Sequence, residues 1–183
     1  MDRDERLSPF HLDKIVIFLF VLFLLSGEAQ RLLNSSGLKW AYLLLLAFGI
    51  GYVATPLVHR LAHWTGVVDV PRGRKAHQSP TALLGGVAVY AAFAFTVLRN
   101  FSFSEELKGI ALAGTLIFLV GLADDVREIP AKLKLAAQLV AVAILIQSGV
   151  VVSFLPEGWW GNAGEWAITA VWVIGITNAV NFL

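Results

Sequence analysis

Apolar residues along this chain gather into long runs that shorter polar stretches separate. Five of these runs are between 17 and 21 residues long. A helix needs about 20 apolar residues to cross the hydrocarbon core of a bilayer. The pattern therefore predicts five membrane-spanning helices, at residues 38–58, 82–98, 107–123, 133–152 and 165–183.

The first 36 residues follow a different pattern, with a mixed-charge lead at 1–14 and eleven unbroken apolar residues at 15–25. Eleven helical residues are short for a hydrocarbon core about 30 Å thick. A helix over 10–27 would be long enough, so we favour a short spanning helix over an interfacial one. The predicted fold is therefore all-α, a polytopic transmembrane bundle of five to six spans. We expect residues 1–36 to form an N-terminal segment with a short apolar helix, and residues 37–183 to form the main membrane-embedded domain.

Composition agrees with a membrane protein, because 57% of the residues are hydrophobic and only 15% are charged. Soluble domains are about 45–50% apolar and about 25% charged. The net charge of +1 and the lack of a basic face give no sign of nucleic-acid binding. Without cysteine, disulfides and thiolate chemistry are excluded within this sequence.

Lysine and arginine in the short loops predict the orientation of the spans. Four lie in 59–81 and three in 124–134, against two in 99–108 and none in 153–164. Because such cations concentrate on the cytoplasmic side, we expect the first two loops to be cytoplasmic. Trp159 and Trp160 on the opposite side are typical of the membrane interface.

Two adjacent acids, Asp124 and Asp125, stand where one apolar run ends and the next is about to begin. A charge is costly at the bilayer centre, so these residues should mark the membrane boundary. With lysines close behind, they suggest a metal or phosphate site, and a solvated loop is the alternative. Lys134 either faces the same site as a phosphate contact or reaches to the interface as a membrane anchor.

Two further groups of polar residues lie in or near the predicted cytoplasmic side. Arg74, Lys75 and His77, among glycines and prolines, could form an anion cradle, or they could serve only to set topology. Asn178 and Asn181 share one face of the last span. Hydrogen bonding between helices is one explanation for them, and a site shared with the two acids is the other.

Three separated stretches resemble the polyprenyl-phosphate N-acetylhexosamine-1-phosphate transferases, and the likeness extends from about residue 37 to the last residue. The three occur in the same order as in that family, and all are predicted on the cytoplasmic side. They are Asp69-x-Pro71-x-x-Arg74-Lys75-x-His77 with Pro80-Thr81 and Gly85-Gly86, then Gly121-x-x-Asp124-Asp125 with Lys134 and Gln138, and finally Thr177-Asn178-Ala179-Val180-Asn181-Phe182-Leu183.

The resemblance implies transfer of a sugar 1-phosphate from a UDP-N-acetylhexosamine to a membrane polyprenyl phosphate, with release of UMP. It also implies Mg²⁺ as cofactor, with Mn²⁺ as the alternative ion, and a bacterial inner or plasma membrane as the location. By this likeness Asp124 and Asp125 are catalytic and bind the metal together with Asn181. The implied substrate-binding residues are Asp69, Arg74, Lys75, His77, Lys134 and Asn178.

The sequence departs from that family in two ways. Ala82 replaces a frequent proline, and the chain stops at Leu183, where the family continues into further acids and spans. We therefore expect the amino-terminal half of a transferase, inactive in this form. A non-catalytic half-length protein, either a remnant or a docking partner, is the alternative. The lipid bilayer is the expected surrounding, and a homodimer is left open.

Overall fold

The computed structural model describes residues 9–69, 81–82, 84–100 and 104–181, with the backbone alone at 9–13, 69, 81–82, 100 and 181. These residues form seven helices and two very short strands, so the predicted helical fold is confirmed. The chain divides into two compact units, Met1–Asn100 and Phe101–Leu183. Each unit is described below by itself.

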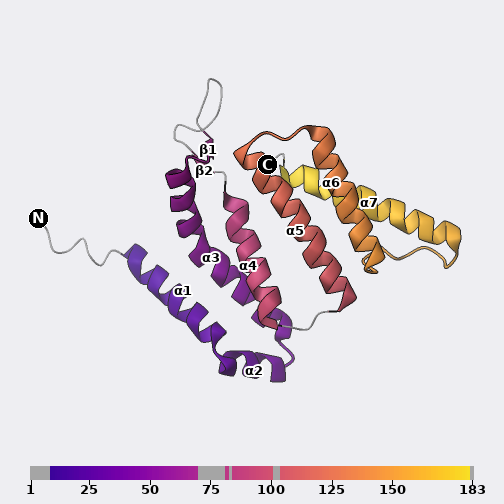
Figure 1. Ribbon diagram of the computed structural model, residues 1–183. Helices are drawn as coiled ribbons and strands as arrows, with labels where there is room; N and C mark the ends of the chain where they lie inside the picture. The colour runs from indigo at the N-terminus through magenta and orange to yellow at the C-terminus, as the bar shows by residue number, and fades with distance from the viewer. Residues whose placement is uncertain (1–8, 70–80, 83, 101–103, 182–183) are drawn as a thin grey trace, which may run out of the picture. The chain divides into compact units, whose positions relative to one another are not determined.

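In the first unit, α3 is the central helix and packs against the other three (Figure 1). Its buried core holds Leu24, Tyr42 and Leu46, where the last turns of α1 meet the first turns of α3. The helices of this unit are α1 (Pro9–Leu25), α2 (Gly27–Ser35), α3 (Lys39–Thr65) and α4 (Gly85–Asn100).

The polar residues between the first two apolar runs form a helix, α2, which the pattern of apolar runs does not predict. Ser26 begins this helix, since its hydroxyl accepts a hydrogen bond of 3.3 Å from the Ala29 N–H. Glu28 in the first turn adds a favourable charge at the helix N-terminus. The axis bends by 72° between α1 and α2, so the chain changes direction sharply at this point.

Helix α3 continues two turns past the predicted boundary at residue 58 and ends at Thr65, where Gly66 has a left-handed φ of 74°. Two two-residue strands then follow, Val68–Asp69 (β1) and Thr81–Ala82 (β2). They pair antiparallel, with Val68 opposite Ala82 and Asp69 opposite Thr81. This ladder, which the sequence did not predict, brings together the two ends of the stretch that contains Arg74, Lys75 and His77.

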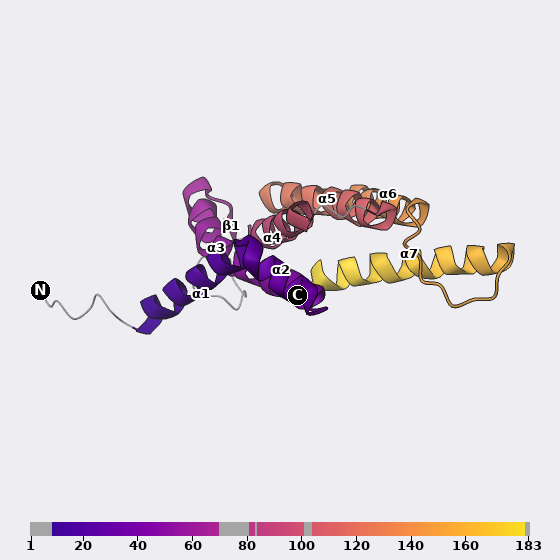
Figure 2. The ribbon, with the colours of Figure 1, turned by 90° about the horizontal axis from the view of Figure 1, so that it is seen from below.

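In the second unit, α6 lies between α5 and α7 and packs against both (Figures 1 and 2). Near the start of α5, Gly109 comes so close to Ser148 that a Cβ at position 109 would overlap the serine side chain. Gly149 follows Ser148 with a left-handed φ of 80° and turns the chain away from α6. The helices are α5 (Glu105–Val126), α6 (Ala131–Gln147) and α7 (Trp159–Asn181).

Three of the described helices, α3, α5 and α7, are long and apolar enough to cross a membrane, and α1 with α2 would make a fourth as one bent span. Their apolar side chains face outward, as Phe48 (69% exposed) and Val171 (75% exposed) show. A bilayer would cover such surfaces, so the chain is an integral membrane protein. By length and apolar composition, three or four spans are found instead of the predicted five to six. The difference arises because α4 has only 16 residues and α6 only 17.

Candidate functional site

The two acids lie inside the last turn of α5, whereas the sequence predicts a loop beginning at Asp124. Helix α5 continues through Val126, and the Arg127 N–H closes its end with a 2.9 Å hydrogen bond to the Ala123 carbonyl. A helix C-terminus carries a partial negative charge. Two carboxylates at this position therefore create a strongly negative site that favours a cation.

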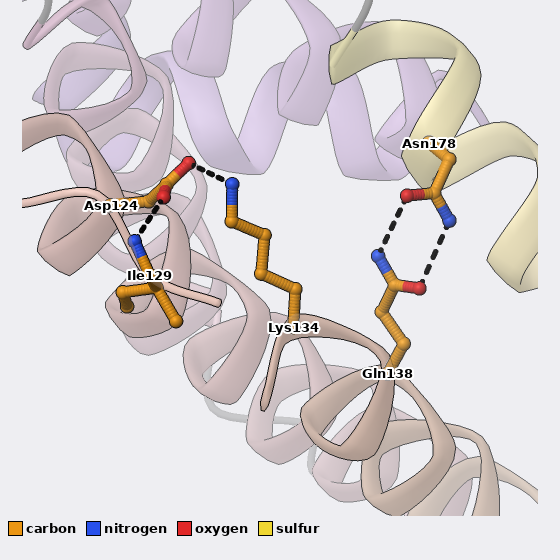
Figure 3. Close-up of polar contacts among 5 residues, drawn as sticks. All are labelled: Asp124, Ile129, Lys134, Gln138 and Asn178. Carbon is orange, nitrogen blue, oxygen red and sulfur yellow. Dashed lines mark hydrogen bonds and ion pairs between the residues drawn. The ribbon is translucent and has the colours of Figure 1, made fainter. Parts of the chain in front are cut away.

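Lys134 supplies one cation, because its Nζ lies 2.5 Å from Asp124 Oδ2 (Figure 3). The other oxygen, Oδ1, accepts a 2.9 Å hydrogen bond from the Ile129 N–H. The short turn between α5 and α6 ends at Pro130 and places Lys134 in the first turns of α6, facing back toward α5. The sequence left open whether Lys134 faces the site of the two acids or reaches to the interface as a membrane anchor. In the structure its side chain points to Asp124.

Asp125 differs from its neighbour, although both carboxylates belong to the same turn. Among the described residues it makes no hydrogen bond and no ion pair, while both oxygens of Asp124 are engaged. Successive residues on a helix point about 100° apart, so the two side chains leave α5 in different directions. Asp125 therefore retains free oxygen atoms for a ligand that the described residues do not supply.

The side-chain amides of Gln138 in α6 and Asn178 in α7 hydrogen-bond to each other (Figure 3). Gln138 lies one helical turn along α6 from Lys134 of the ion pair. Gln138 donates to Asn178 Oδ1 at 3.3 Å, and Asn178 donates to Gln138 Oε1 at 3.0 Å. Asn178 also donates to the Ile174 carbonyl at 2.8 Å. Hydrogen bonding between helices, one of the two explanations for Asn178, is thus present.

Gln138 is the residue that sequence reasoning did not place in the site, although it belongs to the motif. It is only 5% exposed, and it lies one turn after Lys134 on the same face of α6. A glutamine within an apolar run needs hydrogen-bond partners when it is buried. This need was the signal in the sequence that Gln138 could belong to the site. The identity of its partner, forty residues away in sequence, could come only from the structure.

Side chains from α5, α6 and α7 enclose a small cavity of about 60 Å³. This volume has room for a few water molecules, but it is too small for a nucleotide sugar. Asp124, Lys134 and Gln138 contribute its polar wall. The lining residues are Ile117, Val120, Gly121, Asp124, Lys134, Gln138 and Thr177.

The donor set suits a hard divalent cation that retains water and substrate ligands. Within the described part of the chain, no cluster of three or more His, Cys, Asp or Glu residues is present. Mg²⁺, however, is usually held by one or two carboxylates, with phosphates and water completing its octahedron. Asp125, whose oxygens no described residue binds, lies next to Asp124 and fits this requirement.

The remaining predicted site residues cannot be positioned by their side chains. Arg74, Lys75 and His77 lie outside the described residues. Asp69 is placed by its backbone in β1, and Asn181 by its backbone as the last residue of α7. The described site therefore consists of Asp124, Asp125, Lys134, Gln138 and Asn178.

Comparison with known proteins finds a match over residues 107–183 to the family described as glycosyl transferase family 4. This segment is therefore similar to that family. The resemblance predicted from the three motifs is therefore confirmed, and every described residue of the site lies inside the matched segment.

Several bacterial proteins are similar to a larger part of the chain. A probable undecaprenyl-phosphate N-acetylglucosaminyl 1-phosphate transferase from Bacillus subtilis is 30% identical over 137 residues, covering 72% of this chain and 38% of the relative. The decaprenyl-phosphate N-acetylglucosaminephosphotransferase of Mycolicibacterium smegmatis is 34% identical over 150 residues, covering 73% of this chain and 37% of the relative.

The undecaprenyl-phosphate alpha-N-acetylglucosaminyl 1-phosphate transferase of Escherichia coli K12 is 35% identical over 88 residues, covering 48% of this chain and 23% of the relative. The matched part of the chain thus spans well under half the length of these relatives. No solved structure matches the chain significantly.

Proposed function

We propose that the protein transfers N-acetylhexosamine 1-phosphate from a UDP-sugar to a membrane polyprenyl phosphate and releases UMP. The observation that carries the proposal is the Asp124–Lys134 ion pair, which lines a small cavity in the matched segment, with Asp125 next to Asp124 in the same helical turn. The names of the relatives, which are polyprenyl-phosphate N-acetylglucosaminyl 1-phosphate transferases, support the same reaction.

The chemistry of the site suits a reaction between two phosphates. The acceptor phosphate attacks the β-phosphorus of the donor, the bond to the UMP oxygen breaks, and a lipid-linked diphosphate forms. Catalysis of phosphoryl transfer depends mainly on positioning and on electrostatic stabilisation of the phosphate oxygens. Mg²⁺, or Mn²⁺ in its place, supplies positive charge for the diphosphate when bound.

The contacts suggest different roles for the two acids. Both oxygens of Asp124 are engaged, so we assign Asp124 the task of holding Lys134 toward the cavity until substrate arrives. An incoming phosphate then competes with Asp124 for the lysine. Asp125, whose oxygens no described residue binds, is the better metal ligand. Further contacts to substrate or metal come, in this proposal, from Asp69, Arg74, Lys75, His77, Asn178 and Asn181.

The location belongs to the proposal as well. We place the site at the cytoplasmic edge of a bacterial inner or plasma membrane, where a soluble nucleotide sugar can meet a lipid phosphate. Helices of 16 and 17 residues are about 24–26 Å long. With a few interfacial residues, α4 and α6 can therefore cross a thinned bilayer, which restores the five or six spans predicted from the sequence. The homodimer stays a prediction.

The proposal can be tested by measuring UMP release with UDP-N-acetylglucosamine, a polyprenyl phosphate and Mg²⁺, using protein isolated from its native membrane. Loss of one group that stabilises charge in a transition state typically costs about 10²–10³-fold in rate. We therefore expect Asp125→Asn to lower UMP release by about 100-fold or more. Glu128→Gln is the matched control, since Glu128 is an exposed carboxylate three residues away. Equal activity of the two variants would remove Asp125 from the site.

A further inference from the structure

The first unit contains a groove between α1 and α3. The groove has a volume of about 580 Å³, which is within the range of about 300–1,000 Å³ common for ligand pockets. Helix α1 contributes Lys14 and Phe18, which are one turn apart. Helix α3 contributes the rest of the wall, mainly Tyr52, Pro56, His59 and Arg60.

The groove exists because the two helices touch tightly at one end and separate at the other. Leu24 packs against Tyr42 and Leu46, and Val21 lies where a Cβ on Gly49 would come within 2.5 Å of it. Beyond Gly49 this close contact ends, and α1 diverges from α3 toward the first turn of α1 (Figures 1 and 2). The space that opens there is the groove.

Charge is segregated along the groove. Lys14, in the first turns of α1, and Arg60, near the end of α3, are both exposed, and His59 next to Arg60 in sequence also lines the groove. Phe18, Tyr52 and Pro56 form the apolar part. Pro56 has no N–H, so the carbonyl of Tyr52 lacks its usual helical donor. None of the lining residues is acidic.

We propose that this groove binds an anionic phospholipid, with the headgroup phosphate at Lys14 and Arg60 and an acyl chain along Phe18, Tyr52 and Pro56. The occupant has to match both ends of the groove. A free phosphate would need only the cations and would leave the apolar wall uncovered. A further protein helix would cover the apolar wall, but it would also remove Lys14 and Arg60 from water, which is costly. An anionic lipid matches the cations and the apolar wall together.

Charge complementarity also sets the expected size of the effect. One Lys or Arg near an anionic lipid surface contributes enough to change binding about fivefold, so removing both cations should weaken binding roughly 30-fold. The site lies in a different unit from Asp124 and Lys134. The proposal therefore stands independently of the transferase function, and its test needs no measurement of activity.

The experiment is native mass spectrometry of protein isolated from its native membrane and stripped of lipid in a non-ionic detergent. Dioleoyl phosphatidylglycerol, an anionic phospholipid, is titrated against dioleoyl phosphatidylcholine, which has the same chains and no net charge. The test variant is Lys14→Gln with Arg60→Gln. The control is Arg31→Gln with Lys39→Gln, which removes the same charge from exposed positions of the same unit outside the groove.

We expect the test variant to bind phosphatidylglycerol roughly 30-fold more weakly, while the control variant keeps the affinity of the unchanged protein. The charge-preserving variant Lys14→Arg with Arg60→Lys should also keep it. Phe18→Ala should weaken binding of the long-chain lipid more than binding of a short-chain phosphatidylglycerol, because only the long chain reaches the apolar wall.

Several results would overturn the proposal. One is equal loss of phosphatidylglycerol binding in the test and control variants, and another is equal binding of phosphatidylcholine by the unchanged protein. Displacement of the lipid by inorganic phosphate at matched concentration would make this a simple anion site. Displacement by a polyprenyl phosphate at a much lower concentration would instead make it a site for that isoprenoid lipid.

Discussion

Replacing Gln138 with leucine tests whether the amide pair between α6 and α7 holds the site together. Leucine has a similar size, so the change mainly removes the two hydrogen bonds to Asn178, of 3.3 and 3.0 Å. Hydrogen bonds between membrane helices contribute about 0.6 kcal/mol on average and at most about 1.7 kcal/mol. The two bonds together predict a loss of about 1–3 kcal/mol in the free energy of unfolding.

The partner change, Asn178→Leu, should cost about the same or more, because it leaves the amide of Gln138 buried without its partner. Gln138 is 5% exposed, and an unsatisfied buried polar group costs about 1–3 kcal/mol. The double variant leaves no unpaired amide at either position. Its cost should therefore be smaller than the sum of the single costs by about 1 kcal/mol.

The assay is a double-mutant cycle of unfolding free energies, measured by circular dichroism during denaturation of the purified protein in mixed micelles. Gln147→Leu serves as the control, since Gln147 is exposed at the end of α6 and the substitution is the same. If the costs of Gln138→Leu and Asn178→Leu add to within about 0.5 kcal/mol, the two amides are not coupled and the reasoning fails.

Two further predictions follow from the same unit. Lys134→Met should lower UMP release by about 10²–10³-fold. The control is Lys132→Met, which should change UMP release little because Lys132 is exposed. Equal loss of UMP release in both variants would show a general effect of charge. Gly109→Ala should destabilise the α5–α6 pair by about 1–3 kcal/mol in the denaturation assay, because the added Cβ overlaps Ser148, and Ser148→Gly should restore stability. Gly114→Ala is its control, since a Cβ there meets nothing within 4 Å, and an equal cost in both glycine variants would contradict the predicted close contact.

Hydropathy predicted the apolar helices, but it predicted neither where they end nor the polar helix α2. The apolar run that stops before Asp124 marks the membrane core, while α5 continues through Val126 because polar residues can complete a helix at the interface. For the same reason α3 extends past His59 to Thr65, and the polar residues after Ser26 form α2. Caps and tertiary packing decide these boundaries, and a hydropathy pattern does not contain them.

The site could be predicted in part because its residues lie close in sequence. Asp124 and Lys134 are ten residues apart across one short turn, so their meeting follows once both helices form. The difference between Asp124 and Asp125 depends on where the Ile129 N–H points, which residue types do not reveal. The Gln138–Asn178 pair depends on how α7 packs on α6, and a single sequence does not specify that packing.

The most direct test of the proposed reaction follows a radioactive label on the β-phosphate of UDP-N-acetylglucosamine. Protein isolated from its native membrane is incubated with this donor, a polyprenyl phosphate and Mg²⁺, and the lipid and aqueous phases are separated. Transfer of a sugar 1-phosphate predicts that the label moves into the lipid phase while unlabelled UMP appears in water in equal amount. Labelled UDP in water, with an unlabelled sugar on the lipid, would contradict the proposal.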